Sequence, residues 1–236
     1  MKLYNDIIQE TRSELGRADQ RWVYEAGAAW ADLGENEVIL RREAAYELGA
    51  EGREAVHYLC VGTEKGVLEQ DESLLYGDDL PAIREDRDYA RIAILSLHEL
   101  PDDEDEAYRV IRDLEFTKYR IFPRGFMMRI SSSGNREQVR VRRADLDAGL
   151  TFARVGANFV EAYHRKPQVE HVQIIFVTRP ELVKPLEALG RKCRTLTDAL
   201  NHIFEGMPTN CSACQLKPIC DEVEGMRELH FKHRAK

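Results

Sequence analysis

Three short runs of apolar residues stand out against the otherwise mixed pattern of this chain. They lie at residues 55–61 (AVHYLCV), 90–97 (ARIAILSL) and 171–178 (HVQIIFVT). Runs of this length, bounded by glycine or polar residues, are typical of strands that are buried in a sheet. The pattern therefore predicts three buried strands, and residues 171–178 give the clearest signal.

Several other segments of the sequence have patterns that indicate helices. Helices are predicted at residues 2–33, 37–48, 104–119, 147–164 and 180–206. On the first of these helices, one face carries Leu3, Ile7, Ile8 and Leu15. Two more strands are predicted around the segment SSSGN, at residues 126–130 and 138–142, and the polar residues 62–89 are interpreted as mostly loop.

Helices that alternate with strands predict an α+β fold with α/β-like layers, in which a mixed sheet packs against helices. We expect an N-terminal helical segment at residues 1–34 and an α/β domain at residues 35–206. A C-terminal appendage at residues 207–236 contains a cluster of cysteines.

Composition and charge narrow the class of protein. The 236 residues are 43% hydrophobic and 32% charged, as in soluble globular proteins. The net charge of -8 argues against nucleic-acid binding in general. The N-terminus has an amphipathic helix pattern without a signal-peptide run, and no stretch has the apolar length to cross a bilayer. We therefore predict a cytoplasmic protein that binds neither nucleic acid nor membrane.

The cysteine cluster indicates a metal site. Cys211, Cys214 and Cys220 follow a Cys-x2-Cys-x5-Cys spacing. In a reducing compartment, clustered thiols favour metals over disulfides. The spacing suits an iron–sulfur cluster, with zinc as the alternative. A structural or redox role without metal also remains open.

A four-iron cluster needs a fourth ligand in addition to this triplet. Cys193, on a predicted helix upstream, is the first candidate. Cys60 is a weaker one, because cysteines in buried strands are usually inert. His202 and His230 are further possibilities.

A second group of residues is basic. Seven arginines fall within residues 120–143 of this otherwise acidic chain: Arg120, Arg124, Arg129, Arg136, Arg140, Arg142 and Arg143. Guanidinium groups bind phosphate through two parallel hydrogen bonds, and nearby serines and glycines can complete a phosphate site. The group therefore predicts a site for a small anion with several phosphates. The alternative is a set of surface ion pairs with neighbouring carboxylates, which individually contribute little to stability.

Several familiar motifs are missing from the sequence. It contains no nucleophile elbow, Walker-type phosphate loop, dinucleotide fingerprint or metalloprotease motif. A hydrolase or a nucleotide-dependent kinase is therefore unsupported.

The arginine segment and the cysteines together resemble a known family. Residues 131–156, then 169–189, then the cysteine cluster are similar to the central part of CO-methylating acetyl-CoA synthase, the beta subunit of the carbon monoxide dehydrogenase/acetyl-CoA synthase complex. The matching positions are Arg136, Arg140, Val141, Gly149, Phe152, residues 172–178, Cys211 and Cys214. The resemblance covers most of this chain but only the middle portion of the family's longer subunit.

The resemblance implies specific ligands. In that family an arginine-rich surface is implicated in coenzyme A binding, and four cysteines hold a [4Fe-4S] cluster that is joined to two nickel sites. Carried over, Arg136 and Arg140 become coenzyme A candidates, and Arg129 and Arg142 lie beside them. The cluster ligands would be Cys211, Cys214 and Cys220, and the fourth ligand stays open, with Cys193 as the first candidate.

The departures from the family limit the function that we expect. The chain contains no Cys-x-Cys pair to hold the outer nickel, and no cysteine follows Cys220. We therefore expect an iron–sulfur relative of the synthase that binds coenzyme A or an acyl-CoA, or an accessory in carbon monoxide and one-carbon metabolism. Carbon monoxide dehydrogenase or corrinoid protein components would be its partners. The alternatives are a zinc-stabilised, non-catalytic interaction module of such a complex, and a simple electron carrier.

Overall fold

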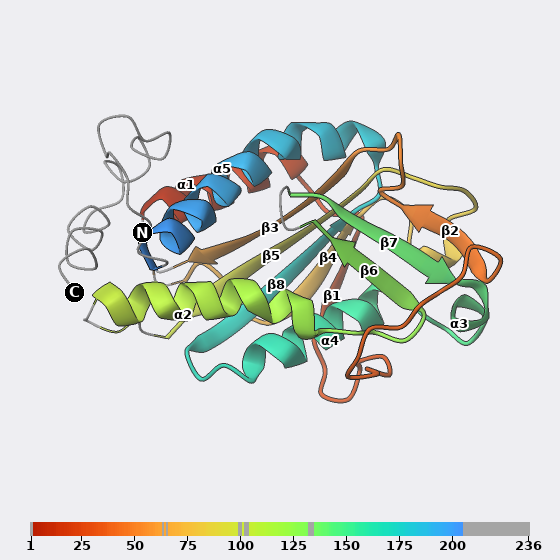
Figure 1. The fold of residues 1–236 in the computed structure, drawn as a ribbon, viewed down its shortest axis with the longest axis horizontal. Coiled ribbons are helices and arrows are strands. Elements are labelled where there is room, and N and C mark those ends of the chain that lie inside the picture. Colours follow the sequence, from red (N-terminus) through yellow and green to blue (C-terminus); the bar gives the residue numbers. More distant parts are fainter. Residues whose placement is uncertain are drawn as a thin grey trace.

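The computed structural model describes residues 2–62, 64, 66–98, 101, 104–131 and 135–204. Within these residues the chain forms five α-helices and two β-sheets (Figure 1). The helices are α1 (Lys2–Leu15), α2 (Glu104–Thr117), α3 (Arg143–Asp147), α4 (Phe152–His164) and α5 (Pro180–Phe204). The strands are β1 (Gln20–Val23), β2 (Ala44–Leu48), β3 (Ala55–Gly62), β4 (Glu72–Tyr76), β5 (Tyr89–Leu97), β6 (Phe126–Ile130), β7 (Glu137–Arg142) and β8 (Val169–Val177). Two short 3-10 helices are η1 (Leu80–Ala82) and η2 (Lys118–Arg120).

The larger sheet is mixed and has the strand order β1-β4-β8-β5-β3. Strand β3 runs parallel to β5 and β4 runs parallel to β8, while β5 and β8 are antiparallel. Helices α1 and α5 pack against β3, and α4 packs against β4 and β8, so that helices cover the strands on two sides (Figure 1). The mixed α+β content agrees with the predicted fold class.

The three apolar runs are confirmed as strands. Every residue of β3 and β5 is buried, as are most residues of β8. Central strands that are covered on both faces need apolar side chains at successive positions, which explains why these runs do not alternate. The predicted pair of strands at residues 126–130 and 138–142 is also confirmed, as the antiparallel pair β6 and β7.

The predicted N-terminal helix is too long. Helix α1 ends at Leu15, because Gly16 takes a φ of 63° and donates its N–H to the carbonyl of Arg12. This left-handed glycine is a common helix terminus. The chain then forms β1, which pairs antiparallel with β4.

The helix predicted at residues 37–48 is wrong. Its second half is β2, which pairs antiparallel with β7 in a smaller sheet of order β2-β7-β6. The alanines, glutamate and leucine of this segment favour a helix locally, but pairing with a distant strand overrides that preference. The interpretation of residues 62–89 as mostly loop missed β4 and η1.

The helix predicted at residues 147–164 is interrupted. Gly149 has a φ of 99° and separates α3 from α4. Helix α4 then begins after Thr151, whose side chain accepts a hydrogen bond from the N–H of Arg154. Helices α2 and α5 lie within their predicted ranges, and no helix among the described residues is long and apolar enough to cross a membrane.

A buried ion pair links the two sheets. Arg91 of β5 donates from Nε to both carboxylate oxygens of Glu137 of β7, at 2.9 and 3.2 Å, and a third bond comes from its Nη2. The two side chains are 2% and 0% exposed. The Arg91 guanidinium also lies 4.2 Å from the ring centroid of Phe159. Burial alone would lower the pKa of Arg91, but the charge and hydrogen bonds of Glu137 outweigh it and raise that pKa.

We predict that loss of one partner of this pair destabilises the fold strongly. Glu137→Met leaves the Arg91 charge buried without compensation, which costs about 3–5 kcal/mol in unfolding free energy. The double variant R91M/E137M removes both charges and should be more stable than either single variant. Urea denaturation of the three variants measures this, and a double variant less stable than both single variants would contradict the prediction.

Candidate anion-binding site

Strand β7 places the predicted arginines on one surface of the smaller sheet. Glu137, Val139 and Val141 are buried, and the alternate positions Gln138, Arg140 and Arg142 are partly exposed. This alternation follows from the two-residue repeat of a strand. The buried carboxylate of Glu137 therefore fixes which face of β7 carries the arginines.

Four arginines line one hollow, which we call the arginine hollow. It has a volume of about 860 Å³, and its arginines are Arg41, Arg129, Arg136 and Arg140. Three acidic residues also line it: Glu47, Glu51 and Asp86. Three of the four arginine positions predicted from the sequence are thus brought together: Arg129, Arg136 and Arg140.

Three of these arginines have no carboxylate partner among the described residues. Arg41 and Arg129 are exposed and form no ion pair there, and Arg136 is exposed and donates only to the carbonyl oxygen of Arg53, at 3.0 Å. An exposed guanidinium without a counter-charge is free to bind an anion from solution. These three arginines are the strongest feature of the site.

Arg140 has a structural partner. Its Nη2 lies 2.7 Å from a carboxylate oxygen of Glu47 on β2, and its Nη1 donates to the carbonyl of Ile39, at 2.7 Å. The side chain is only 16% exposed. Arg140 therefore ties β7 to β2 and contributes less free charge to the arginine hollow.

Arg142 lies outside the lining of the arginine hollow. Its guanidinium forms ion pairs with Glu37 and, at 3.3 Å, with Asp145. Burial acts against the charged form, but the hydrogen bond and charge of Glu37, followed by the charge of Asp145, raise the pKa of Arg142. For this residue the structure matches the alternative of a structural ion pair.

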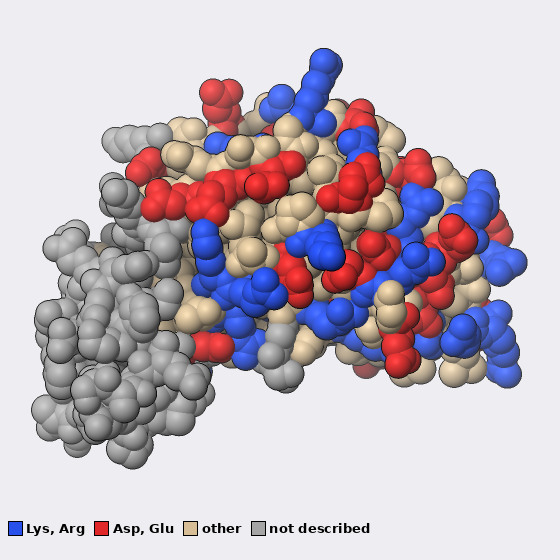
Figure 2. All heavy atoms as spheres, turned by 90° about the horizontal axis from the view of Figure 1, so that it is seen from above, with Lys and Arg blue, Asp and Glu red and all other residues tan. Residues whose placement is uncertain are grey.

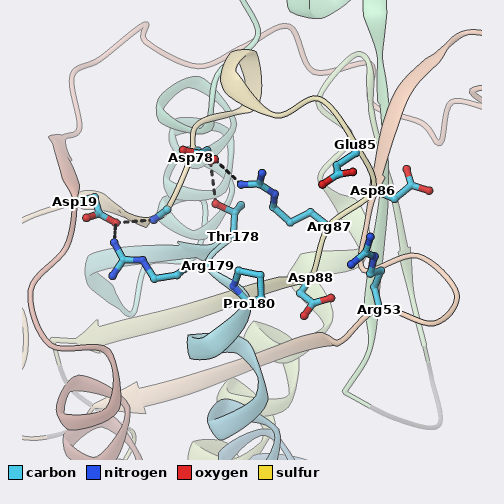
Figure 3. A pocket seen from close by; sticks show the side chains of 11 residues that line it. Asp19, Arg53, Asp78, Glu85, Asp86, Arg87, Asp88, Thr178, Arg179 and Pro180 are labelled. Carbon is cyan, nitrogen blue, oxygen red and sulfur yellow. Dashed lines mark hydrogen bonds and ion pairs between the residues drawn. The ribbon is translucent and has the colours of Figure 1, made fainter.

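A neighbouring hollow lies where β4 and β8 end and α5 begins (Figure 3). Asp19 accepts hydrogen bonds from Arg179, at 2.5 Å, and from the N–H of Gly77, at 2.6 Å. Arg87 pairs with Asp78 at 2.6 Å. Because five carboxylates outnumber three arginines in this lining, the hollow suits an anion less well than the arginine hollow does.

Two arginines of this region escaped the sequence reading. Arg41 reaches the arginine hollow from the segment before β2, and Arg53, in the loop before β3, lines the neighbouring hollow and forms no ion pair among the described residues. Only the pairing of β2 with β7 brings Arg41 beside Arg129 and Arg136. No local sequence pattern signals that pairing.

Charges of both signs share the face of the molecule that includes α5 (Figure 1, Figure 2). Figure 2 shows basic and acidic side chains interleaved on this face, without a broad field of one sign. A polyanion such as nucleic acid favours a continuous basic surface. The surface is better suited to a compact anion held by a few arginines.

The predicted metal ligands are placed only in part. Cys211, Cys214, Cys220 and His230 lie outside the described residues, as does the side chain of His202. Cys193 lies on α5 and is 4% exposed, with its sulfur 3.6 Å from that of Cys60 on β3. Burial, and then the hydrogen bond with Cys60, raises the pKa of Cys193 well above its ordinary value.

A cysteine binds a metal as the thiolate. To hold a cluster, Cys193 would therefore have to lose its proton, which its burial beside Cys60 disfavours. Among the described residues, no group of three histidine, cysteine, aspartate or glutamate side chains is arranged to hold a metal ion. The predicted cluster thus depends on the C-terminal cysteines.

Comparison with protein-family models and with curated proteins found no match to this chain. The resemblance to acetyl-CoA synthase therefore stays a prediction from the sequence. The geometry of the arginine hollow stands independently of it.

We predict that Arg129 and Arg142 contribute differently to stability. Arg142→Ala removes two ion-pair partners from a partly buried side chain and should cost about 1–2 kcal/mol in unfolding free energy. Arg129→Ala removes an exposed side chain that forms no ion pair within the described part of the chain, and should change that free energy by less than about 0.5 kcal/mol. Chemical denaturation measures both, and equal losses would contradict the division between paired and unpaired arginines.

Proposed function

We propose that this protein binds a phosphate-bearing anion of the coenzyme A type in the arginine hollow. The observation that carries the proposal is the set of three exposed arginines without carboxylate partners among the described residues: Arg41, Arg129 and Arg136. Each can offer two parallel N–H groups to phosphate oxygens.

The size and lining of the hollow support this ligand class. A volume of about 860 Å³ lies within the range of small-molecule and cofactor sites. The loop between β2 and β3 contributes Ala50 and Gly52, and neither position carries a large side chain that would fill the space beside the guanidinium groups. A ligand with separate phosphates can reach several arginines while its neutral parts lie near Glu51 and Asp86.

We propose further that Cys211, Cys214 and Cys220 hold a [4Fe-4S] cluster, with zinc as the alternative metal. When bound, such a cluster would supply electron transfer or a Lewis-acidic iron. Cys193 remains the candidate for the fourth ligand. The proposed role beside carbon monoxide dehydrogenase or corrinoid proteins in one-carbon metabolism rests on the family resemblance alone.

Coenzyme A binding tests the first proposal. Isothermal titration of the wild-type protein should give saturable binding, and the double variant R129A/R136A should weaken it at least about tenfold, because charge-assisted hydrogen bonds to phosphate are lost. Pantetheine, which lacks the phosphates, should not compete.

Arg191→Ala is the matched control. Its side chain is 68% exposed on α5, pairs with Glu187 and does not line the arginine hollow. This variant should bind coenzyme A like the wild type. Unchanged affinity in R129A/R136A, or equal competition by pantetheine, would remove the support for the site.

Metal content tests the cluster. We predict that protein purified without oxygen is brown and carries about four iron atoms per chain, and that Cys211→Ser or Cys214→Ser loses most of this iron. Iron analysis and electron paramagnetic resonance of the reduced protein measure this.

Variants of the two buried cysteines, Cys60 and Cys193, test which residue is the fourth ligand. Cys60→Ala, a change on β3, should retain the iron, and loss of iron in Cys193→Ala would identify Cys193 as the fourth ligand. Colourless protein with stoichiometric zinc would contradict the iron–sulfur assignment and favour the zinc alternative.

A further inference from the structure

A separate hollow, which we call the aromatic hollow, lies between β1, residues 24–30 and helix α4. It has a volume of about 780 Å³. Trp22, Tyr24 and Trp30 contribute aromatic side chains, and Ala153 and Ala157 of α4 contribute small ones. Apart from Tyr24, the charged and hydroxyl-bearing residues of the lining are Arg21, Glu25, Ser73 and Arg154. Concave sites that combine aromatic side chains with a small number of placed polar groups are typical of small-molecule binding sites.

Trp30 is held through both its backbone and its indole ring. Buried Asn158 accepts a hydrogen bond from the N–H of Trp30, at 3.0 Å, and donates to its carbonyl oxygen, at 2.8 Å. The indole Nε1 donates to the carbonyl of Arg124, at 2.9 Å. Because the oxygen and the nitrogen of the buried Asn158 amide both bond the backbone of Trp30, they fix a segment that has no regular secondary structure. The Trp30 side of the hollow is therefore preformed.

Strand β1 and the residue after it supply two further aromatic lining residues. Trp22 and Tyr24 are two positions apart, so they lie on the same side of the extended chain. The hydroxyl of Tyr24 donates to Glu161 of α4, at 3.3 Å. Ala153 and Ala157 of α4, which also line the hollow, have small side chains that fill little of it.

One arginine of this lining forms no ion pair among the described residues, although Glu25 also lines the hollow. The guanidinium of Arg154 lies 5.0 Å from the ring centroid of Trp30 and has no carboxylate partner among the described residues. Arg21, which also lines the hollow, is by contrast paired with Glu72. Arg154 is exposed and is therefore available to an anionic group on a ligand that lies against the aromatic walls.

We infer that the aromatic hollow binds a small planar heteroaromatic molecule that carries an anionic group. The ring lies against Trp22 and Tyr24 over the alanine floor, and the anionic group pairs with Arg154. The site shares no lining residue with the arginine hollow, so the inference goes beyond the proposed coenzyme A binding and does not depend on it.

Tryptophan fluorescence tests the inference directly, because both tryptophans of the chain, Trp22 and Trp30, line this hollow. Three probes separate ring from anion: adenosine monophosphate has both, adenosine has only the ring, and ribose 5-phosphate has only the anion. Adenosine monophosphate should change the fluorescence saturably, adenosine should bind about tenfold more weakly, and ribose 5-phosphate should cause no change.

Three variants locate the binding. Arg154→Gln should reduce the affinity for adenosine monophosphate to that of adenosine, and Ala153→Leu should block both ligands by filling the floor, with unchanged melting temperatures showing that each variant folds. The double variant R129A/R136A should bind like the wild type. No fluorescence change with adenosine monophosphate, equal affinity of adenosine in the wild type, or loss of binding in R129A/R136A would overturn the inference.

Discussion

The buried ion pair between Arg91 and Glu137 is the interaction on which this structure depends most. Arg91 lies on a central strand of the larger sheet, and Glu137 is the first residue of β7 in the smaller one. A charge this deeply buried is tolerated only opposite its partner, so the pair restricts how the two sheets can pack. It also sets the face of β7, because a shift by one residue would place Glu137 on the outer side.

The orientation of β7 leaves the arginines of this region in two different environments. Arg140 and Arg142 share the outer face of β7, yet each finds a carboxylate, on Glu47 and Glu37 respectively. Arg129 and Arg136 lie at the other end of the same strand pair and find none among the described residues. The ion-pair interpretation therefore applies to Arg140 and Arg142, and the proposed anion site rests on Arg129 and Arg136.

The sequence predicts the parts of the fold that depend on local pattern. The apolar runs of β3, β5 and β8 are visible because a strand covered on both faces needs apolar residues throughout. Strands β1, β2 and β4 were missed because they are short and take their conformation from distant partners. The sequence AAYEL of β2 favours a helix and becomes a strand only against β7.

For the candidate site, too, the sequence predicts only what depends on residues close together in the chain. Arg129 and Arg136, which belong to the arginine-dense residues 120–143, line one hollow, and whether they bind an anion stays a prediction. The ion pair between Arg142 and Glu37 cannot be predicted from a local pattern, because the two residues are 105 positions apart in the sequence. Likewise the aromatic hollow joins Trp22 and Trp30 to Arg154 of α4, and no motif connects them.

The central claim is that β7 and its neighbours present unpaired arginines to an anion while their paired neighbours only support the fold. Nuclear magnetic resonance of the arginine side-chain Nε–H groups, recorded while coenzyme A is added, tests this most directly. The account predicts that the signals of Arg41, Arg129 and Arg136 shift in a saturable manner, whereas those of Arg91 and Arg142 stay in place. Shifts confined to Arg142 or to arginines outside the hollow, or no shifts, would contradict it.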